Sequence, residues 1–483
     1  MKRSLILALV ALVLASAGRA ADEPVYAVKN TNAPPLDLAK AIHERIKPLK
    51  NDRGRRWPMI LWECLSFDPQ PLETNRMLLE RGLVQHVRMD DKMIPTAKAI
   101  QEAGGPVIMM EGAGGPWPAS LAGDAAKWAH QFEPGYSPGE GAKPCLALHH
   151  EGWAINADRV RGILRKYEEA GVTVNAVWLD WEGDPLGPQY EQARHCVRCK
   201  AMLPAGVLAN PDNCRRYNWR LYTGLLDAYL AAPVREVFPT CSIANWMICY
   251  STPDRPARFW GDSLLMPAIP AFFTHSNPIV YGNTVHWKQW NPAWPLDREH
   301  VDQFYFQLLL RMVSDDAANR LRWAPDKRGV PWVARWCPDD EDPKIPLMSR
   351  ERYREVLRHI WLRGTDAMQV FNATRRGYED IVFAEVEDAV SVYDEMLAYR
   401  EFLDAGEVMC TDSPGVQDSG AVWSGLRLED RAVVRVFKQG GDTSEVKIEP
   451  WPGQAVSLAA RPEGRTFIVV SKGGKAAVEQ EWR

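Results

Sequence analysis

Two carboxylates at the end of an apolar run have the types and spacing best suited to catalysis. The run Val177-Trp178-Leu179 is followed by Asp180-Trp181-Glu182. Alternate residues of a strand share one face, so we expect Asp180 and Glu182 to point the same way, with side chains starting about 7 Å apart. A neighbouring Trp wall would keep one carboxyl group protonated near neutral pH while the other stays ionised. Cleavage of a glycosidic bond needs such a pair; a solvated turn or a structural ion pair is the alternative interpretation.

Carboxylates this close together suit a particular glycosidase mechanism. In substrate-assisted enzymes the 2-acetamido oxygen of the sugar is the nucleophile. Glu182 would then be the general acid and base, and Asp180 would orient the acetamido group. A conventional two-carboxylate mechanism would need a partner from another strand, for which Glu63, Glu111 and Asp90 are candidates. A non-catalytic carbohydrate-binding barrel is a third interpretation, against which the presence of both carboxylates argues.

Other expected strands end in polar or aromatic residues that could line the same site. The candidates for binding a sugar are Glu63, Asp90, Glu111, Asn245, Trp246, Tyr281, Arg335, Gln369 and Asn372. A helix cap or a loop hydrogen bond is an equally good interpretation of any single one, and we expect Asp91 to cap a helix that starts at Lys92. The aromatic-rich segment from Tyr281 to Trp294 is either a stacking platform for a sugar chain or a Trp cluster that packs a loop.

A cysteine cluster follows the proposed catalytic strand. His195, Cys196 and Cys199, with Cys214 nearby, have the ligand types of a structural zinc site. A disulfide is the competing interpretation in an oxidising compartment, and in either case we expect the cluster to stabilise the conformation of a loop. No catalytic metal or other cofactor is expected. His149 and His150, if they lie on a strand, point in opposite directions and would not easily bind one ion.

Strand-like and helical segments alternate through most of the chain, which predicts a parallel sheet with helical crossovers. About eight repeats favour a TIM-type (β/α)8 barrel over an open doubly wound sheet, because no Gly-rich nucleotide turn follows the first strand. The expected strands are 57–63, 83–89, 106–111, 173–182, 239–246, 264–272, 331–336 and 365–371. The expected helices are 72–81, 92–103, 155–170, 215–230, 301–320, 349–363 and 385–403.

The last part of the chain has a different pattern. Short alternating runs at 421–427, 432–437, 444–448 and 466–470 lie between turns rich in Gly and Asp, which predicts a small all-β, sandwich-like domain. The predicted organisation is therefore a signal peptide (1–20), an N-terminal arm (21–55), a catalytic barrel (56–405) and a C-terminal β domain (406–483).

The N-terminus and the composition indicate an exported globular protein. Lys2 and Arg3 precede a short apolar run and small residues, as in a cleaved signal peptide, so a secreted or periplasmic location is expected. The 483 residues are 46% hydrophobic and 25% charged, with net charge -4 and no basic tract, which argues against nucleic acid as a partner. No later segment is apolar enough to span a membrane. The 20 Trp residues favour a polysaccharide substrate, because Trp rings can pack against the apolar faces of sugars.

The Asp180-Trp181-Glu182 motif at the end of a fourth barrel strand resembles the catalytic motif of the hyaluronidase family of glycoside hydrolases. Further segments resemble that family in order and spacing: Phe238–Cys241, Trp260–Ser263, Leu265–Ile269, Val330–Ala334 and Ile360–Val370. The resemblance implies a retaining, acetamido-assisted hydrolase of a glycosaminoglycan-like polymer. The family's substrate-binding Tyr is absent from Pro267–Pro270, so Tyr281 or Tyr250 would have to supply that hydroxyl.

Overall fold

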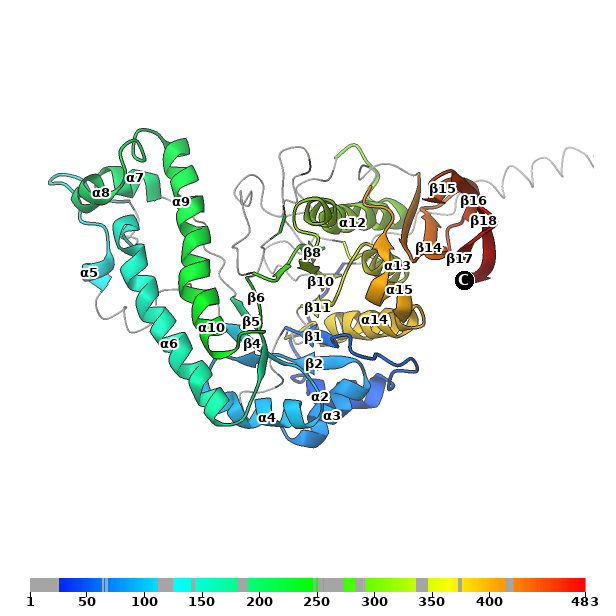
Figure 1. The fold of residues 1–483 in the computed structure, drawn as a ribbon, viewed down its shortest axis with the longest axis horizontal. Coiled ribbons are helices and arrows are strands. Elements are labelled where there is room, and N and C mark those ends of the chain that lie inside the picture. Colours follow the sequence, from blue (N-terminus) through cyan, green and yellow to red (C-terminus); the bar gives the residue numbers. More distant parts are fainter. Residues whose placement is uncertain are drawn as a thin grey trace, which may run out of the picture.

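The structure is a computed structural model. It describes residues 26–62, 65, 68–111, 125–139, 144–179, 189–245, 249–250, 255, 273–282, 290, 292–335, 346–371, 376–412, 415 and 420–482. This part of the chain forms an α/β unit of parallel strands and a C-terminal unit of antiparallel strands (Figure 1). Among the described residues, we find no helix with the length and apolar character needed to cross a bilayer.

The α/β unit is built from short strands that pair in parallel. They are β1 (Met59–Leu61), β2 (Leu83–Gln85), β3 (Val87–Arg88), β4 (Val107–Glu111), β5 (Val174–Leu179), β6 (Ser242–Asn245), β7 (His275–Ser276), β8 (Ile279–Tyr281), β9 (Arg328–Gly329), β10 (Trp332–Ala334) and β11 (Gln369–Val370). One sheet has the order β2-β1-β11-β10-β8, a second has the order β3-β4-β5-β6, and β7 pairs with β9.

Local breaks separate these sheets. Only His86 lies between β2 and β3, and only residues 277–278 lie between β7 and β8. The backbone N–H of Thr274 donates to the carbonyl of Ile243 in β6, over 3.0 Å, so the segment before β7 lies beside the second sheet. The predicted parallel α/β architecture followed by an all-β domain is confirmed. Closure into an eight-stranded barrel stays a prediction.

Helices connect the strands and cover them (Figure 1). They are α2 (Leu38–Arg45), α3 (Leu72–Glu80), η1 (Asp91–Met93), α4 (Ile94–Glu102), α5 (Ala125–Trp128), η3 (Leu146–Leu148), α6 (His149–Glu169), α7 (Gln189–Arg194), α8 (Val197–Met202), α9 (Pro211–Leu226), the π-helical η4 (Asp227–Ala231), α10 (Ala232–Val237), α12 (Arg298–Trp323), α13 (Arg350–Trp361), α14 (Glu379–Leu397) and α15 (Arg400–Ala405). Side-chain caps start several of them: Asn210 accepts from the Asn213 N–H before α9, and Ser349 from the Arg352 N–H before α13.

Some elements differ from the sequence prediction. The expected strand 264–272 lies outside the described residues, and the strand described in this part of the chain is 275–281. The expected helix 385–403 is two helices, because the chain turns at 398–399 between α14 and α15. His149 and His150 begin helix α6 and are not on a strand. The predicted amphipathic helix within α12 is buried on most sides, because Phe306 packs against Phe437 of the C-terminal unit, with ring centroids 4.8 Å apart.

The C-terminal unit has two layers. A five-stranded sheet contains β12 (Glu407–Val408), β13 (Ala421–Arg427), β14 (Arg431–Lys438), β17 (Arg465–Lys472) and β18 (Lys475–Trp482), and a hairpin contains β15 (Ser444–Trp451) and β16 (Gln454–Ala460). Val434 and Val436 pack against the hairpin, whereas Val433 and Phe437 belong to the core shared with the α/β helices. Strand β14 is therefore buried on both faces, which explains its nearly continuous apolar run. Strands β16 and β18 were not predicted.

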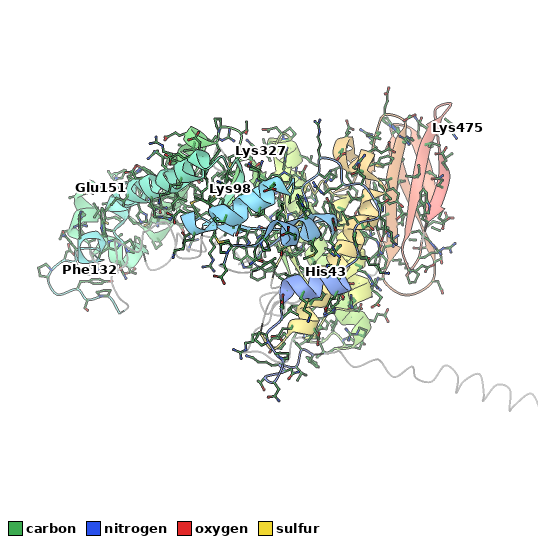
Figure 2. The ribbon with its side chains drawn as sticks, turned by 90° about the horizontal axis from the view of Figure 1, so that it is seen from below. His43, Lys98, Phe132, Glu151, Lys327 and Lys475 are labelled. Atoms are coloured by element: carbon green, nitrogen blue, oxygen red, sulfur yellow. The ribbon has the colours of Figure 1, made fainter. Side chains whose placement is uncertain are left out.

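A second group of elements projects from the opposite side of the α/β unit. Helices α6 and α9 extend away from the strands, and α5, α7 and α8 lie at their far end (Figure 1). We call residues 125–139, 144–148 and 189–210 the distal unit. Phe132 of this unit and Lys475 of the C-terminal sheet lie at opposite ends of the molecule (Figure 2).

Candidate functional site

The carboxyl ends of three parallel strands are in register where the predicted catalytic motif begins. Leu179 of β5 is paired with Glu111 of β4 on one side and with Asn245 of β6 on the other. Asp180 is the next residue along the chain. Among the candidates, Asp180 and Glu182 lie outside the described residues, as do Glu63, Trp246 and Asn372, and for Glu111 only the backbone is described.

The two faces of these strands have different surroundings. Trp178 of β5 donates a hydrogen bond through Nε1 to Nε2 of His275 in β7, over 2.5 Å. Burial, followed by the charge of Arg328, lowers the pKa of His275 to about 3, so this ring is neutral and can accept the bond. Asn245 points the other way, since its Nδ2 lies 3.1 Å from the hydroxyl of Tyr222 in α9. Asn245 therefore links β6 to helix α9, whereas Trp178 lies on the opposite side of the strands and faces β7.

Aromatic rings from β8, from β10 and from the residues that directly follow β1, β2 and β11 lie together. Trp62 lies 4.6 Å from Trp332 and 5.7 Å from Phe371, and Phe371 stacks on Tyr281 with centroids 4.7 Å apart and planes at 14°. We call Trp62, His86, Tyr281, Trp332 and Phe371 the aromatic cluster; Trp62 and Phe371 are half-buried, and the others are buried. Of these five, the sequence predicted only Tyr281 as a site residue. The signal that could have found Trp62 and Phe371 is that both directly follow a strand.

Gln369 lies beside this cluster with an unused polar group. Its neighbours in register are Ile60 of β1 and Trp332 of β10. The side chain is fully buried, and neither its Oε1 nor its Nε2 has a hydrogen-bond partner within the described part of the chain. A buried amide without partners is costly, so a ligand group or water bound here would stabilise it.

Two other candidates have structural partners. The backbone N–H of Arg335 donates to Glu385 of α14 over 2.8 Å, and its Nη2 lies 3.4 Å from the carbonyl of Ile381. Asp90 accepts from the Lys92 N–H and caps η1. The expectation that Asp91 is the cap was wrong, because Asp91 pairs with Lys166 of α6 over 2.5 Å, and this hydrogen bond lowers the pKa of Asp91.

The described part of the aromatic-rich segment packs against a helix. Trp290 and Trp294 lie 5.4 Å apart, centroid to centroid. Trp290 contacts Phe304 of α12 at 5.1 Å, and Trp294 contacts His300 at 5.0 Å. These contacts support the loop-packing interpretation for the two Trp residues. Residues 283–289 and 291 lie outside the described residues.

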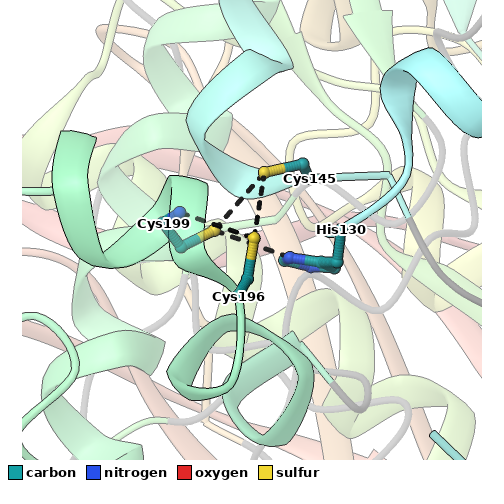
Figure 3. A group of neighbouring side chains, drawn as sticks. All are labelled: His130, Cys145, Cys196 and Cys199. Carbon is teal, nitrogen blue, oxygen red and sulfur yellow. Dashed lines mark hydrogen bonds between the residues drawn. The ribbon is translucent and has the colours of Figure 1, made fainter. Parts of the chain in front are cut away.

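The cysteine cluster differs from the predicted one. His130, Cys145, Cys196 and Cys199 are all buried, and one potential ligand atom of each lies within 4.8 Å of the others (Figure 3). His195 is not part of this group, because it stacks on Tyr136 with centroids 4.1 Å apart. Cys214 is not part of it either, although it is buried in the same small core. The sequence pattern does not indicate His130 and Cys145, because both lie about 50 residues or more before Cys196 and Cys199 in the chain.

The thiol groups in the cluster influence one another. The Sγ atoms of Cys145 and Cys199 lie 3.4 Å apart, and the hydrogen bond between them lowers the pKa of Cys145 to about 4 while it raises that of Cys199. His149, directly beyond η3, is buried, and this burial lowers its pKa to about 4. His149 does not belong to the group of four.

Comparisons with known proteins assign no family. No family model matches the sequence, and no curated protein matches it. Solved structures that match are α-L-fucosidase isoenzyme 2 from Paenibacillus thiaminolyticus (11% identity, 73% of this chain, 51% of that chain, TM-score 0.42), the GH36 α-galactosidase AgaA from Geobacillus stearothermophilus (12%, 85%, 52%, 0.44) and an Anoxybacillus α-amylase (12%, 80%, 80%, 0.42). This chain spans about half the length of the first two. None of the three is a hyaluronidase, so the resemblance to that family stays a prediction.

Proposed function

We propose that this protein is an exported glycoside hydrolase whose catalytic pair is Asp180 and Glu182 on a (β/α)8 barrel. The observation that carries the proposal is the side of β5 on which Trp178 lies. Trp178 contacts His275 of β7, which in a barrel lies toward the inner side of the strands, whereas Asn245 contacts α9, which covers their outer side. If the strand alternation continues past Leu179, Asp180 and Glu182 share the inner side with Trp178.

The pairing of the strands supports the barrel. Neighbours follow in the order β3, β4, β5 and β6, then the 273–281 segment, β10, β11, β1 and β2. No strand pairing is described between β6 and the 273–281 segment, but the hydrogen bond from the Thr274 N–H to the Ile243 carbonyl links the two. In barrel enzymes the active site lies at the carboxyl ends of the strands, which is where Asp180 follows β5.

The aromatic cluster and Gln369 suit a carbohydrate. Sugars present apolar faces bordered by hydroxyl groups, and the half-buried rings of Trp62 and Phe371 offer matching apolar surfaces. The unpaired amide of Gln369 offers both a donor and an acceptor to a hydroxyl group. A site with mostly apolar walls and a few polar groups is typical of ligand pockets.

The spacing of the two carboxylates favours the substrate-assisted mechanism. Glu182 protonates the leaving oxygen and then activates water, while Asp180 holds the 2-acetamido group that attacks the sugar carbon. The expected substrate is therefore a polysaccharide containing N-acetylhexosamine. The conventional two-carboxylate mechanism with Glu63, Glu111 or Asp90 is the second candidate.

The test compares hydrolysis of N-acetylated and non-acetylated polysaccharides by the purified protein. We expect cleavage of the acetylated polymers only. Glu182→Gln should abolish cleavage and keep binding, while the surface control Glu191→Gln, which removes an exposed partner of Arg194, should leave turnover unchanged. Activity confined to polymers without acetamido groups would refute the substrate-assisted mechanism. Binding without cleavage by the wild-type protein would favour the non-catalytic barrel.

A further inference from the structure

Three separate chain segments meet inside the distal unit and bring four ligand-type side chains together. His130 follows α5, Cys145 precedes η3, and Cys196 and Cys199 lie at the start of α8. Backbone bonds hold the segments beside one another: Val197 N–H donates to Gln131 O over 2.8 Å, and Cys145 N–H donates to Trp128 O over 2.7 Å. The cluster therefore joins an insertion that precedes α6 to one that follows β5.

Three of the six distances between the ligand atoms lie close to the edge lengths of a metal tetrahedron. With Zn–S near 2.3 Å and Zn–N near 2.05 Å, tetrahedral angles put two sulfurs about 3.8 Å apart and a sulfur and a nitrogen about 3.6 Å apart. The Sγ of Cys145 lies 3.9 Å from that of Cys196 and 3.4 Å from that of Cys199. The Sγ of Cys199 lies 3.5 Å from Nδ1 of His130. A disulfide needs sulfurs about 2.05 Å apart, and it would use only two of the three thiols.

The surroundings of the four residues are those of a closed site. The Sγ of Cys196 accepts backbone N–H groups of Gln131 at 3.3 Å and Cys199 at 3.5 Å. Hydrogen bonds of this kind orient and stabilise thiolate ligands. The rest of the surrounding core is mostly apolar, with Trp128, Leu146, Leu148 and Ala193 packed around the cysteines. This wall excludes water from the centre.

We propose that His130, Cys145, Cys196 and Cys199 bind one Zn²⁺ ion in a structural site that fastens the distal unit. Three thiolates and one imidazole are a ligand set that zinc prefers, and four protein ligands leave no open position for substrate. Binding displaces the thiol protons, and each ligand contributes one lone pair to the ion.

The site also has a consequence for the carboxyl ends of the strands. Helix α6 has 21 residues and leads into β5, which has six. A helix of that length is about 31 Å long and such a strand about 20 Å. Because α6 runs back beside its strand, it extends past the strand's carboxyl end, and the metal would hold the two insertions together there. Metal binding at this site is independent of the proposed reaction.

The experiment measures metal in the purified full-length chain. We expect one zinc per chain by elemental analysis. Replacement by Co²⁺ should produce sulfur-to-cobalt charge-transfer absorption and the visible bands of tetrahedral cobalt. His130→Gln and Cys145→Ser should lose the metal. The matched controls His195→Gln and Cys214→Ser remove the neighbouring residues outside the group of four and should retain it.

A second measurement covers variants that fail to fold. Wild-type protein treated with a chelator should release zinc to a colorimetric reporter and become cleavable by protease within residues 125–210, and added Zn²⁺ should reverse the cleavage. Alkylation of the denatured, chelated protein should modify Cys145, Cys196 and Cys199. The proposal is overturned if the protein neither contains nor takes up zinc, if mass spectrometry finds a disulfide among these cysteines, or if the control variants lose metal as the ligand variants do.

Discussion

A buried ion pair joins the C-terminal sheet to the α/β unit, and breaking it should destabilise the protein measurably. Arg435 of β14 donates to both carboxylate oxygens of Glu355 in α13, through Nε at 2.8 Å and Nη2 at 2.6 Å. The exposed fractions of the two side chains are 2% and 5%. Arg358 and His359 also face Glu355, at 3.1 and 3.4 Å.

The magnitude depends on which partner is removed. Loss of one member of a buried pair costs about 3–5 kcal/mol, since the other charge is left uncompensated. Arg435→Met leaves Glu355 with Arg358 and His359, so we expect a loss near the lower end, about 3 kcal/mol. Among the described residues, Glu355→Leu leaves the buried guanidinium with Thr466 Oγ1 and the Glu463 carbonyl as hydrogen-bond acceptors, so we expect about 5 kcal/mol. The double variant should recover most of either loss.

The assay is urea unfolding followed by circular dichroism, with Lys472→Met as the control. Lys472 and Glu479 form an exposed pair in the same sheet, whose loss should cost less than about 1 kcal/mol. A loss below about 1 kcal/mol for Arg435→Met, or additive losses in the double variant, would refute the reasoning.

The pH dependence of the pair gives a second check. Burial raises the pKa of Glu355, but the charge of Arg435, the neighbouring His359 and the hydrogen bonds from Arg435 outweigh it and hold the pKa well below its usual range. A depressed carboxyl pKa stabilises the folded state above the unfolded value of about 4.3 and loses that contribution as the pH falls below it. The stability difference between wild type and Arg435→Met should therefore shrink below about pH 4.

Three further predictions concern the α/β unit. Burial lowers the pKa of His86 to about 4, so stability should fall between about pH 6.5 and 4, as the unfolded chain takes up a proton that the folded one excludes; His86→Gln should flatten this fall in urea midpoints. Gly82 has φ +69° and a Cβ there would lie 2.9 Å from Leu49 Cδ1, so Gly82→Ala should lower the free energy of unfolding by more than about 1 kcal/mol; an unchanged value would contradict the strain. Trp62→Ala should weaken oligosaccharide binding about tenfold by calorimetry, and unchanged affinity would remove Trp62 from the sugar site.

Much of the fold could be predicted from local pattern. Strands β4 and β5 have nearly continuous apolar sequences because both of their faces are buried. The bounds of β13 and β14 lie within one residue of the predicted ones. Helix starts were harder to predict. At η1, either Asp90 or Asp91 could accept a hydrogen bond from a free backbone N–H of the first turn. Asp90 is the cap, because Asp91 forms an ion pair with Lys166 of α6.

The aromatic cluster shows what local pattern could not decide. Trp62 and Phe371 directly follow β1 and β11, and Tyr281 is the last residue of β8. These strands are far apart in the sequence, and only the parallel pairing of β1, β8, β10 and β11 brings the three rings together. In the same way, the amide of Gln369 is an ordinary polar group in the sequence, and burial between Ile60 and Trp332 is what makes it a candidate for binding.

By itself the sequence determined the residue types available for chemistry: the carboxylates at 180 and 182, the Cys196-x-x-Cys199 motif, and the alternation of strands and helices. Tertiary structure alone decided which residues complete a site, since His130 replaces His195 and Cys145 replaces Cys214 beside the two neighbouring cysteines. The physical reason is that periodicity and capping act over a few residues. A metal site or a ligand pocket instead depends on distances of a few ångströms between segments far apart in the chain, and Cys145 and Cys199 are more than 50 residues apart.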